Sequence, residues 1–259
     1  MFLSKTTLFI RILLIYLFVL SPYNLFSKNI DLNYEVEWKT LHIANLMWSA
    51  KIDGLNYSID NQIISNGFFN KMYPFELKSL TLGEIESNSF YPNSFTYISQ
   101  SKKKTKSIEL NFNKNGFVED YKILPAPESL YVNNFEDLKL DKSFIDPISQ
   151  LFQYFLFQTT LNRTIIDGRR IYDLKSDTIK AKKFDFIESI NFQGVTSGLK
   201  ITFPSYMSLW KDPKDDINHM EYVDIYYSKF DNTNIPVQIV IKTKRVKVFL
   251  NLSSYNIIN

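Results

Sequence analysis

Short glycine-containing turns, each between two runs of alternating apolar and polar residues, are the feature that most constrains this chain. The first of them is Asp53-Gly54, and the pattern recurs around Asn115-Gly116 and at Asp167-Gly168. An Asp-Gly or Asn-Gly pair in this setting is the strongest short-range signal for a β-hairpin, because glycine readily adopts the positive φ that the turn requires. The pattern therefore predicts a chain built largely from antiparallel hairpins.

Other strands are recognised from the same period of two. Tyr34, Val36 and Trp38 share one face of the first such segment, and charged residues occupy the opposite face. With the hairpins, these segments make about ten short strands, which indicates a mainly β protein with an antiparallel sheet that is strongly curved or barrel-like. The later strands are expected at residues 184–192, 199–203, 222–227 and 237–252.

One segment has helical spacing instead. Asp146 is a favourable N-cap and Pro147 suits the first helical position. A single amphipathic helix is expected here, covering the sheet or filling an opening, and a polar connection at residues 125–142 precedes it. This helix and connection argue against a membrane β-barrel. The apolar face of the helix comprises Ile148, Leu151, Phe152, Phe155 and Leu156.

The N-terminus has the features of a secretion signal. Lys5 and Arg11 precede an apolar run at residues 12–20, and Ser27 provides a small residue for cleavage. The run is shorter than the roughly 20 residues that a membrane-spanning helix needs. We expect residues 1–27 to be removed on export to the periplasm, leaving one β-rich domain at residues 28–259. An uncleaved leader that anchors the chain in the membrane is the alternative.

The composition argues against several kinds of site. Without cysteine there is no disulfide, thiolate metal site or lipidated cysteine, and the chain has no phosphate-binding or dinucleotide-binding glycine motif. His42 and His219 are far apart, so neither a zinc site nor a histidine-based triad is indicated. The net charge is +3, and Lys5 and Arg11 of the leader account for two of these charges, which leaves +1. We therefore predict no cofactor, no metal, no catalytic residue and no nucleic-acid partner.

Charged residues provide two further candidates. Glu35 and Glu37 share a strand face, and Asp215 and Asp216 are adjacent in a polar segment. Paired carboxylates support acid–base catalysis when burial adjusts their pKa values, but the first pair is expected to face solvent. The lysine-rich run at residues 102–106 would suit anionic lipid, although such runs also protect exposed turns from aggregation. The near-neutral charge of the mature chain favours the protective role.

Aromatic residues make up 16% of the chain and offer a third kind of site. Inward-facing aromatic side chains would line a cavity for an apolar ligand if the sheet closes. They would equally fill a dry core, which is their common use in β proteins. The candidates for such a lining are Trp38, Trp48, Phe184 and Phe186.

Three motifs occur in a familiar order: residues 146–149 at the start of the helix, residues 166–174, and residues 235–239. With the segment from Trp38 to Gly54, this order resembles the bacterial exported family called domain of unknown function 3108. The resemblance implies a β-rich periplasmic domain over roughly residues 31–252, and it brings no established activity or catalytic residues.

The chain departs from the family pattern at two points. Arg245 lies where a glycine-containing turn is expected before the last strand, and a cysteine expected between Tyr172 and Phe203 is missing. These departures bear on the register of the last strands and on any site that the family shares.

Three functions are compatible with these observations. The leading hypothesis is a non-enzymatic binding or envelope-maintenance module for an apolar or amphiphilic ligand such as a lipid. An enzyme that acts on an envelope polymer would require two carboxylates in one cleft. A structural partner of an envelope protein would present an exposed apolar patch or an unpaired edge strand.

Overall fold

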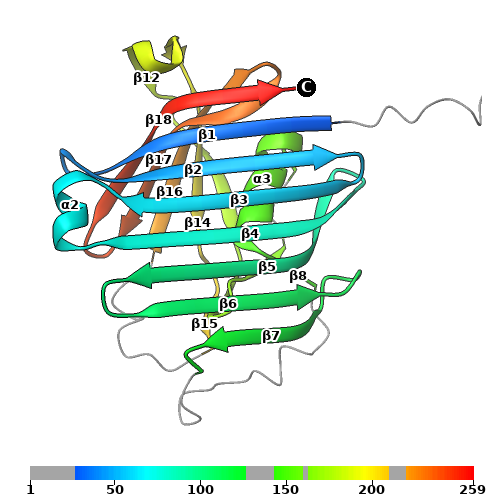
Figure 1. The fold of residues 1–259 in the computed structure, drawn as a ribbon. Helices are drawn as coiled ribbons and strands as arrows, with labels where there is room; N and C mark the ends of the chain where they lie inside the picture. The colour runs from blue at the N-terminus through cyan, green and yellow to red at the C-terminus, as the bar shows by residue number, and fades with distance from the viewer. Residues whose placement is uncertain (1–26, 127–142, 160–162, 210–219) are drawn as a thin grey trace, which may run out of the picture.

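The computed structural model describes residues 27–126, 143–159, 163–209 and 220–259. Residues 1–26 of the predicted leader, most of the predicted connection at residues 125–142, and Asp215, Asp216 and His219 lie outside the described residues. The described chain is mainly β, as predicted, and its strands are organised around one twelve-stranded antiparallel sheet (Figure 1).

The first side of this sheet is a meander of consecutive strands, each paired with the next. Alternation of buried and exposed residues is clear in the early strands, where every second side chain faces the interior. The strands are β1 (Ser27–Trp38), β2 (Leu41–Asp53), β3 (Asn56–Ser65), β4 (Phe75–Glu86), β5 (Ser89–Ser101), β6 (Thr105–Phe112) and β7 (Val118–Leu124).

The second side is formed by the C-terminal part of the chain. The last strand pairs with β1, so the two ends of the described chain meet in the middle of the sheet. In order outward from β1, the strands are β18 (Lys247–Ile258), β17 (Thr233–Thr243), β16 (Met220–Phe230), β14 (Ser197–Thr202) and β11 (Lys175–Ile179).

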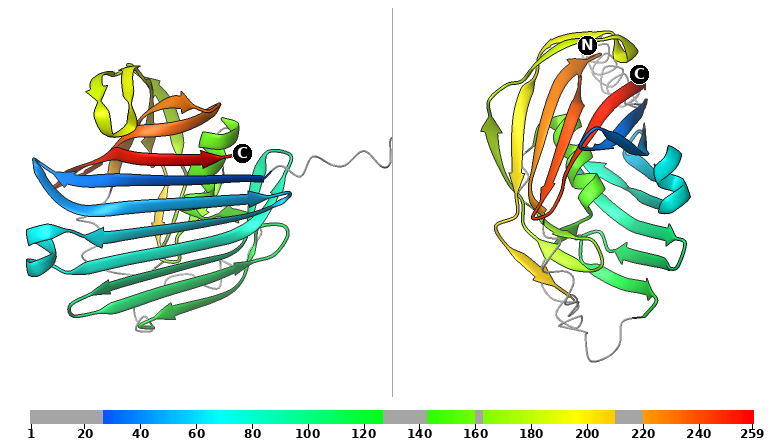
Figure 2. Two further views of the ribbon diagram at one scale, coloured as in Figure 1. Left: turned by 45° about the horizontal axis from the view of Figure 1, so that its top comes forward. Right: turned by 90° about the vertical axis from the view of Figure 1, so that its left-hand side faces the viewer.

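The sheet curls until its two sides face each other across helix α3 (Pro147–Phe157), as Figure 2 shows. Its outer strands, β7 and β11, are not paired with one another, so the sheet is strongly curved but not closed. A large hydrophobic core lies between the helix and both sides of the sheet, and it includes Trp48, Phe152 and Ile239. The helix lies on the concave side of the sheet, where Phe152 and Phe155 join this core.

Smaller elements complete the fold. A short helix α2 (Gly67–Met72) follows β3, and a second sheet adjoins the curved one. A two-stranded hairpin with an intervening 3-10 turn η3 (Glu188–Ile190) packs against β18. The second sheet has the order β15 (Tyr206–Ser208), β10 (Arg170–Tyr172), β9 (Thr164–Ile166) and β8 (Phe144–Ile145), and the hairpin consists of β12 (Lys183–Ile187) and β13 (Phe192–Val195).

Two predicted strands are divided in the structure. The segment at residues 237–252 contains a turn after Thr243, whose Oγ1 accepts a hydrogen bond from the Val246 N–H at 3.0 Å, and this turn separates β17 from β18. The segment at residues 184–192 is interrupted by η3. Both predictions failed because the turns contain no glycine in the predicted hairpin pattern.

Candidate binding site

A row of directly paired residues crosses the concave face of the sheet. Trp48 on β2 pairs with Asn61 on β3, Asn61 pairs with Ser79 on β4, and Ser79 pairs with Tyr97 on β5. Tyr97 then pairs with Ile108 on β6. Paired residues project from the same face of an antiparallel sheet. The row therefore changes from apolar at Trp48 to polar at Asn61 within one strand spacing.

The apolar end of the row borders a pocket of about 160 Å³ between the sheet and α3. Trp48 and Tyr172 carry the only polar side-chain atoms among its described lining residues. Such a surface offers dispersion contacts and apolar burial, with few groups that bind water. The lining residues are Trp48, Pro147, Leu151, Ile165, Tyr172, Leu174, Ile201, Phe203, Met220, Val223, Ile225, Ile239, Ile241 and Leu250.

Trp48 is fixed by aromatic neighbours on two sides. Its ring meets Tyr34 edge-on at 5.4 Å between centroids and Phe152 of α3 edge-on at 5.7 Å. The side chain is 6% exposed, and its Nε1–H has no hydrogen-bond partner among the described residues. A buried indole N–H usually finds an acceptor, so this donor is free to meet a polar atom of a ligand or a water molecule.

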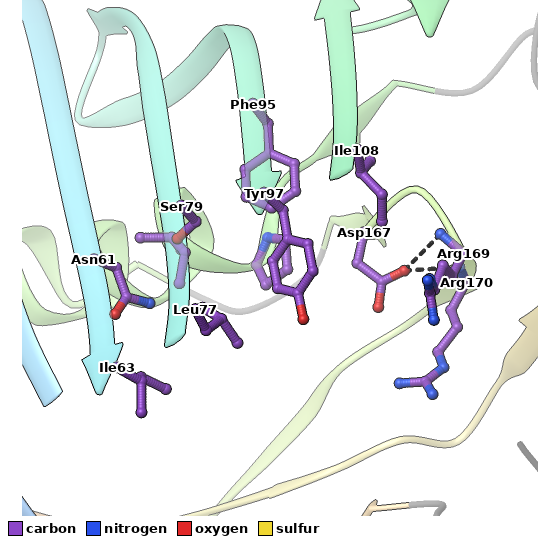
Figure 3. Close-up of a pocket in the computed structure, with 12 residues that line it drawn as sticks. Asn61, Ile63, Leu77, Ser79, Phe95, Tyr97, Ile108, Asp167, Arg169 and Arg170 are labelled. Atoms are coloured by element: carbon purple, nitrogen blue, oxygen red, sulfur yellow. Dashed lines mark hydrogen bonds between the residues drawn. The ribbon is translucent and has the colours of Figure 1, made fainter. Parts of the chain in front are cut away.

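The polar end of the row borders a second pocket, of about 340 Å³ (Figure 3). Here Asn61, Ser79 and Tyr97 of the sheet face the turn between β9 and β10. Asn61 is 6% exposed, and its Oδ1 has no hydrogen-bond partner among the described residues. The remaining lining residues are Ile63, Leu77, Phe95, Ile108, Pro147, Ile148, Asp167, Arg169 and Arg170.

The turn that completes this pocket is the predicted Asp167-Gly168 turn. Asp167 Oδ1 accepts hydrogen bonds from the backbone N–H groups of Arg169 and Arg170, both at 2.8 Å. Gly168 has φ +82° and packs so closely on Ile108 of β6 that a Cβ atom would overlap the Ile108 side chain. Glycine thus lets the turn dock onto the sheet and brings both arginines to the pocket wall.

Burial raises the pKa of Asp167, against the opposing effects of the neighbouring arginines and of the two backbone hydrogen bonds. Among the described residues that line the polar pocket, the charged ones are Asp167, Arg169 and Arg170.

The first turn of α3 is capped by a fully buried carboxyl group. Asp146 Oδ1 accepts hydrogen bonds from the N–H groups of Ile148 and Ser149 and from Thr81 Oγ1, each at 3.0 Å. Burial raises the pKa of Asp146, although these hydrogen bonds act in the opposite direction. Asp146 Oδ2 and both polar side-chain atoms of Gln150 are buried without partners among the described residues. The interface between α3 and the sheet is therefore unusually polar around the helix start.

The same structural elements build both pockets. Pro147 at the start of α3 lines both of them, followed by Ile148 in the polar pocket and Leu151 in the apolar one. The β9–β10 hairpin contributes Ile165 to the apolar pocket and Asp167 to the polar pocket. The two pockets therefore lie beside the N-terminal end of the helix, where Pro147 contributes to both linings.

The four predicted lining residues are placed in different regions. Trp48 lines the apolar pocket, whereas Trp38 is half-buried at the end of β1 beneath Lys39 Nζ, 5.2 Å from its ring centroid. Phe184 packs against Phe192 in the β12–β13 hairpin, and Phe186 is 58% exposed. The structure brings none of these three residues to the pockets beside α3.

The other charged candidates are also separate from the pockets. Glu35 is exposed, and His42 Nε2 lies 2.9 Å from the Ala44 carbonyl oxygen. Lys102 to Lys104 form the exposed turn between β5 and β6, where Lys104 N–H donates to Ser101 Oγ at 3.3 Å. The protective role of the lysine run stays a prediction.

Sequence reasoning missed Asn61, Ser79 and the arginines of the turn. A signal for Asn61 was present, because this polar residue continues the inward-facing alternation of Tyr57 and Ile59. Asp167 was recognised as part of a turn, but only the tertiary structure shows that the turn faces Asn61 across a pocket.

No group of three or more His, Cys, Asp or Glu residues in the described part of the chain is placed to hold a metal ion. Among the described helices, none has the length and apolar character needed to cross a membrane.

The fold and its pockets define a class: an open, strongly curved antiparallel sheet with a helix on its concave side and two pockets beside that helix. The family model described as "Protein of unknown function (DUF3108)" matches residues 33–245. The chain belongs to this family, which confirms the resemblance seen in its motifs.

A comparison with solved structures finds a match that covers most of this chain and nearly all of the other. It is described as the crystal structure of a beta-barrel-like protein of domain of unknown function DUF1849 from Brucella abortus. Sequence identity is 10% and the TM-score is 0.49, over 89% of this chain and 98% of the other. A search of curated proteins finds no match.

Proposed function

We propose that this chain is an exported, non-enzymatic binding protein of the bacterial envelope that holds an apolar or amphiphilic ligand beside α3. The observation that carries the proposal is the apolar pocket of about 160 Å³, lined almost wholly by carbon atoms. An apolar cavity of about 150 Å³ is sufficient to bind a molecule of the size of benzene. The pocket therefore suits a small apolar molecule or part of a hydrocarbon chain.

The pattern of residues 1–27 supports export, since a basic start, a short apolar run and a small residue are typical of a cleavable leader. A periplasmic domain that carries an apolar group between aqueous surroundings and a membrane needs a pocket shielded from water. The apolar pocket lies between the sheet and α3, and Trp48, Ile201 and Ile239 of its lining belong to the hydrophobic core.

The arrangement favours binding over hydrolysis of an envelope polymer. That alternative requires two acidic side chains in one cleft, as in glycoside hydrolysis. In the two pockets beside α3, Asp167 is the one carboxyl side chain among the described lining residues. Its Oδ1 is engaged by the backbone of its own turn.

The test is native mass spectrometry with lipid extraction on mature protein purified from the periplasm without detergent. We expect a stoichiometric amphiphile that leaves the protein on extraction with organic solvent. A clean mass of the free protein, with no binding of added dodecanol or dodecanoate, would contradict the proposal.

A pocket-filling variant locates the binding. Val223 lines the apolar pocket, so Val223→Phe should occupy part of its volume and weaken ligand binding at least tenfold. Val195→Phe is the matched control, because Val195 is 65% exposed on β13. Equal binding by both variants would place the ligand elsewhere.

A further inference from the structure

We infer that one end of the curved sheet docks onto a membrane surface that contains anionic lipid. Four connections form this surface, which we call the basic end. They meet there because alternate connections of an antiparallel meander lie at the same end, and because β18 runs antiparallel to β1 (Figure 1). Docking here does not depend on the pockets beside α3, so it goes beyond the proposed function. The connections are residues 39–40, residues 66–74 with α2, residues 102–104 and residues 244–246.

The four connections are held close together by backbone contacts. The Asn66 N–H donates to the Ile43 carbonyl oxygen at 2.9 Å, which fixes the start of α2 beside the first residues of β2. Asn70 of α2 and Lys102 of the β5–β6 turn line one shallow pocket. The last residue of β1 pairs with Val248, which places the β17–β18 turn beside the β1–β2 turn. The basic end is therefore one surface and not four separate turns.

Positive charge is concentrated at this end, although the whole chain is nearly neutral. The four connections contain no acidic residue. The matching connections of the opposite end, at residues 54–55, 87–88, 113–117 and 231–232, contain one lysine and one aspartate. Anionic lipid attracts such a surface through each cation that comes near it. Six exposed cations of the basic end form no ion pair within the described part of the chain: Lys39, Lys71, Lys102, Lys103, Lys104 and Arg245.

Large apolar side chains protrude among these cations. Helix α2 has no buried residue, and Phe68, Met72 and Tyr73 are 76%, 52% and 61% exposed. Leu41, directly after the β1–β2 turn, is 59% exposed. A group of exposed apolar side chains typically marks an interaction site. Cations mixed with aromatic and aliphatic side chains match the membrane interface, where the cations meet phosphate groups and the apolar groups enter the acyl boundary.

The kind of cation favours a membrane over an acidic protein. Five of the six unpaired cations are lysines. Lysine is depleted at protein–protein interfaces, where arginine is enriched, whereas lysine-rich surfaces are typical of proteins that bind anionic lipid. The long apolar stem of lysine also lies along an apolar surface while its ammonium group reaches the head groups.

The test is co-sedimentation of the mature protein, residues 28–259, with lipid vesicles, so that the leader makes no contribution. Vesicles of equal parts phosphatidylglycerol and phosphatidylcholine should bind the protein about tenfold more tightly than vesicles of phosphatidylcholine alone. The affinity should fall as salt is added, because salt screens exposed charges. Equal affinity for the two kinds of vesicle overturns the inference. No binding to either kind also overturns it and would leave the basic end to an acidic protein.

Lysine variants locate the contact on the protein. Lys102→Gln with Lys103→Gln and Lys104→Gln should lower the affinity for the anionic vesicles about tenfold. Arginine at the same three positions keeps the charge and should retain binding. A control that removes three exposed lysines near the opposite end should bind as the wild type does, and an equal loss there would overturn the assignment to the basic end. The control variant is Lys51→Gln with Lys114→Gln and Lys229→Gln.

Apolar variants test whether the side chains of α2 enter the membrane. Phe68→Ser with Met72→Ser should lower the affinity for anionic vesicles about tenfold and leave its dependence on salt unchanged. The matched control is Leu55→Ser with Ile258→Ser, because these side chains are 71% and 54% exposed at the opposite end. Both variants should unfold at the urea concentration of the wild type. Unchanged vesicle binding by the α2 variant would show adsorption by charge alone and would overturn docking through α2.

Discussion

Trp48 and Asn61 are direct partners on β2 and β3, yet Trp48 lines an apolar pocket and Asn61 lines a polar one. Each side chain is buried, and each has a polar atom without a partner among the described residues. The pair therefore marks the boundary between an apolar and a polar environment on one face of the sheet.

Trp48 should report ligand binding through its fluorescence. A brominated fatty acid in the apolar pocket would lie against the indole ring and quench its emission. Trp48→Phe keeps the pocket apolar and should remove this quenching, whereas Trp38→Phe, at the half-buried end of β1, should not. Equal quenching in the Trp48→Phe variant would place the probe away from the pocket.

The Asp146 cap should contribute measurably to stability. Asp146→Ala removes three hydrogen bonds at the start of α3 and should lower the free energy of unfolding by about 1–3 kcal/mol. Asp146→Asn keeps an acceptor oxygen and should cost much less. Urea denaturation of both variants provides the measurement, and equal losses would show that the negative charge, rather than the acceptor, is what the helix requires.

Asp146 should also make stability depend on pH. Burial raises its pKa in the folded protein, while the unfolded chain has a pKa of about 4. Between these two pKa values the folded state retains a proton that the unfolded state has released, so stability falls as pH rises. The stabilisation is fully present below about pH 4 and declines above it until the folded pKa is passed.

The measurement is urea denaturation of the wild type and of Asp146→Asn at a series of pH values from about 4 upward. The wild type should lose more stability than the variant as pH rises. Asp167 has a raised pKa as well, so the double variant with Asp167→Asn should be flatter still. Parallel curves for all three proteins would mean that neither carboxyl group has a raised pKa.

Gly168 should be essential for docking the turn that bears the arginines. Gly168→Ala imposes both a strained positive φ and an overlap with Ile108, and should cost about 2–4 kcal/mol. Gly67→Ala is the matched control, because Gly67 has φ +53° with open space around it, and it should cost only about 1 kcal/mol.

A double-mutant cycle tests the contact itself. Ile108→Ala removes the atoms that the new methyl group would meet, so its combination with Gly168→Ala should destabilise by less than the sum of the single changes. An additive result would show that backbone strain alone accounts for the effect of Gly168→Ala.

Much of the fold was predictable because its signals are local. The turns at Asp53-Gly54 and Asp167-Gly168, the cap at Asp146 and the proline at residue 147 depend on neighbouring residues only. Turns built from other residues were missed. Ser87 and Asn88 adopt positive φ between β4 and β5, and no glycine marks them.

The binding site was much less predictable. Trp48 was recognised as an inward-facing aromatic residue, but nothing in its strand distinguishes it from Trp38. Phe184 and Phe186 have the same alternation, although their short hairpin packs at the other side of the sheet. Periodicity indicates which face of a strand is buried, but it does not indicate what the buried face meets.

The sequence by itself determined the early strands with their glycine-containing turns and the capped helix, because period, turn chemistry and capping act over a few residues. Only the tertiary structure decided that the sheet stays open, that α3 lies inside it, and that the turn at residues 167–170 faces Asn61. Those relationships join residues about a hundred positions apart in the chain. They depend on sheet curvature and on the close packing of Gly168 against Ile108, which no local pattern encodes.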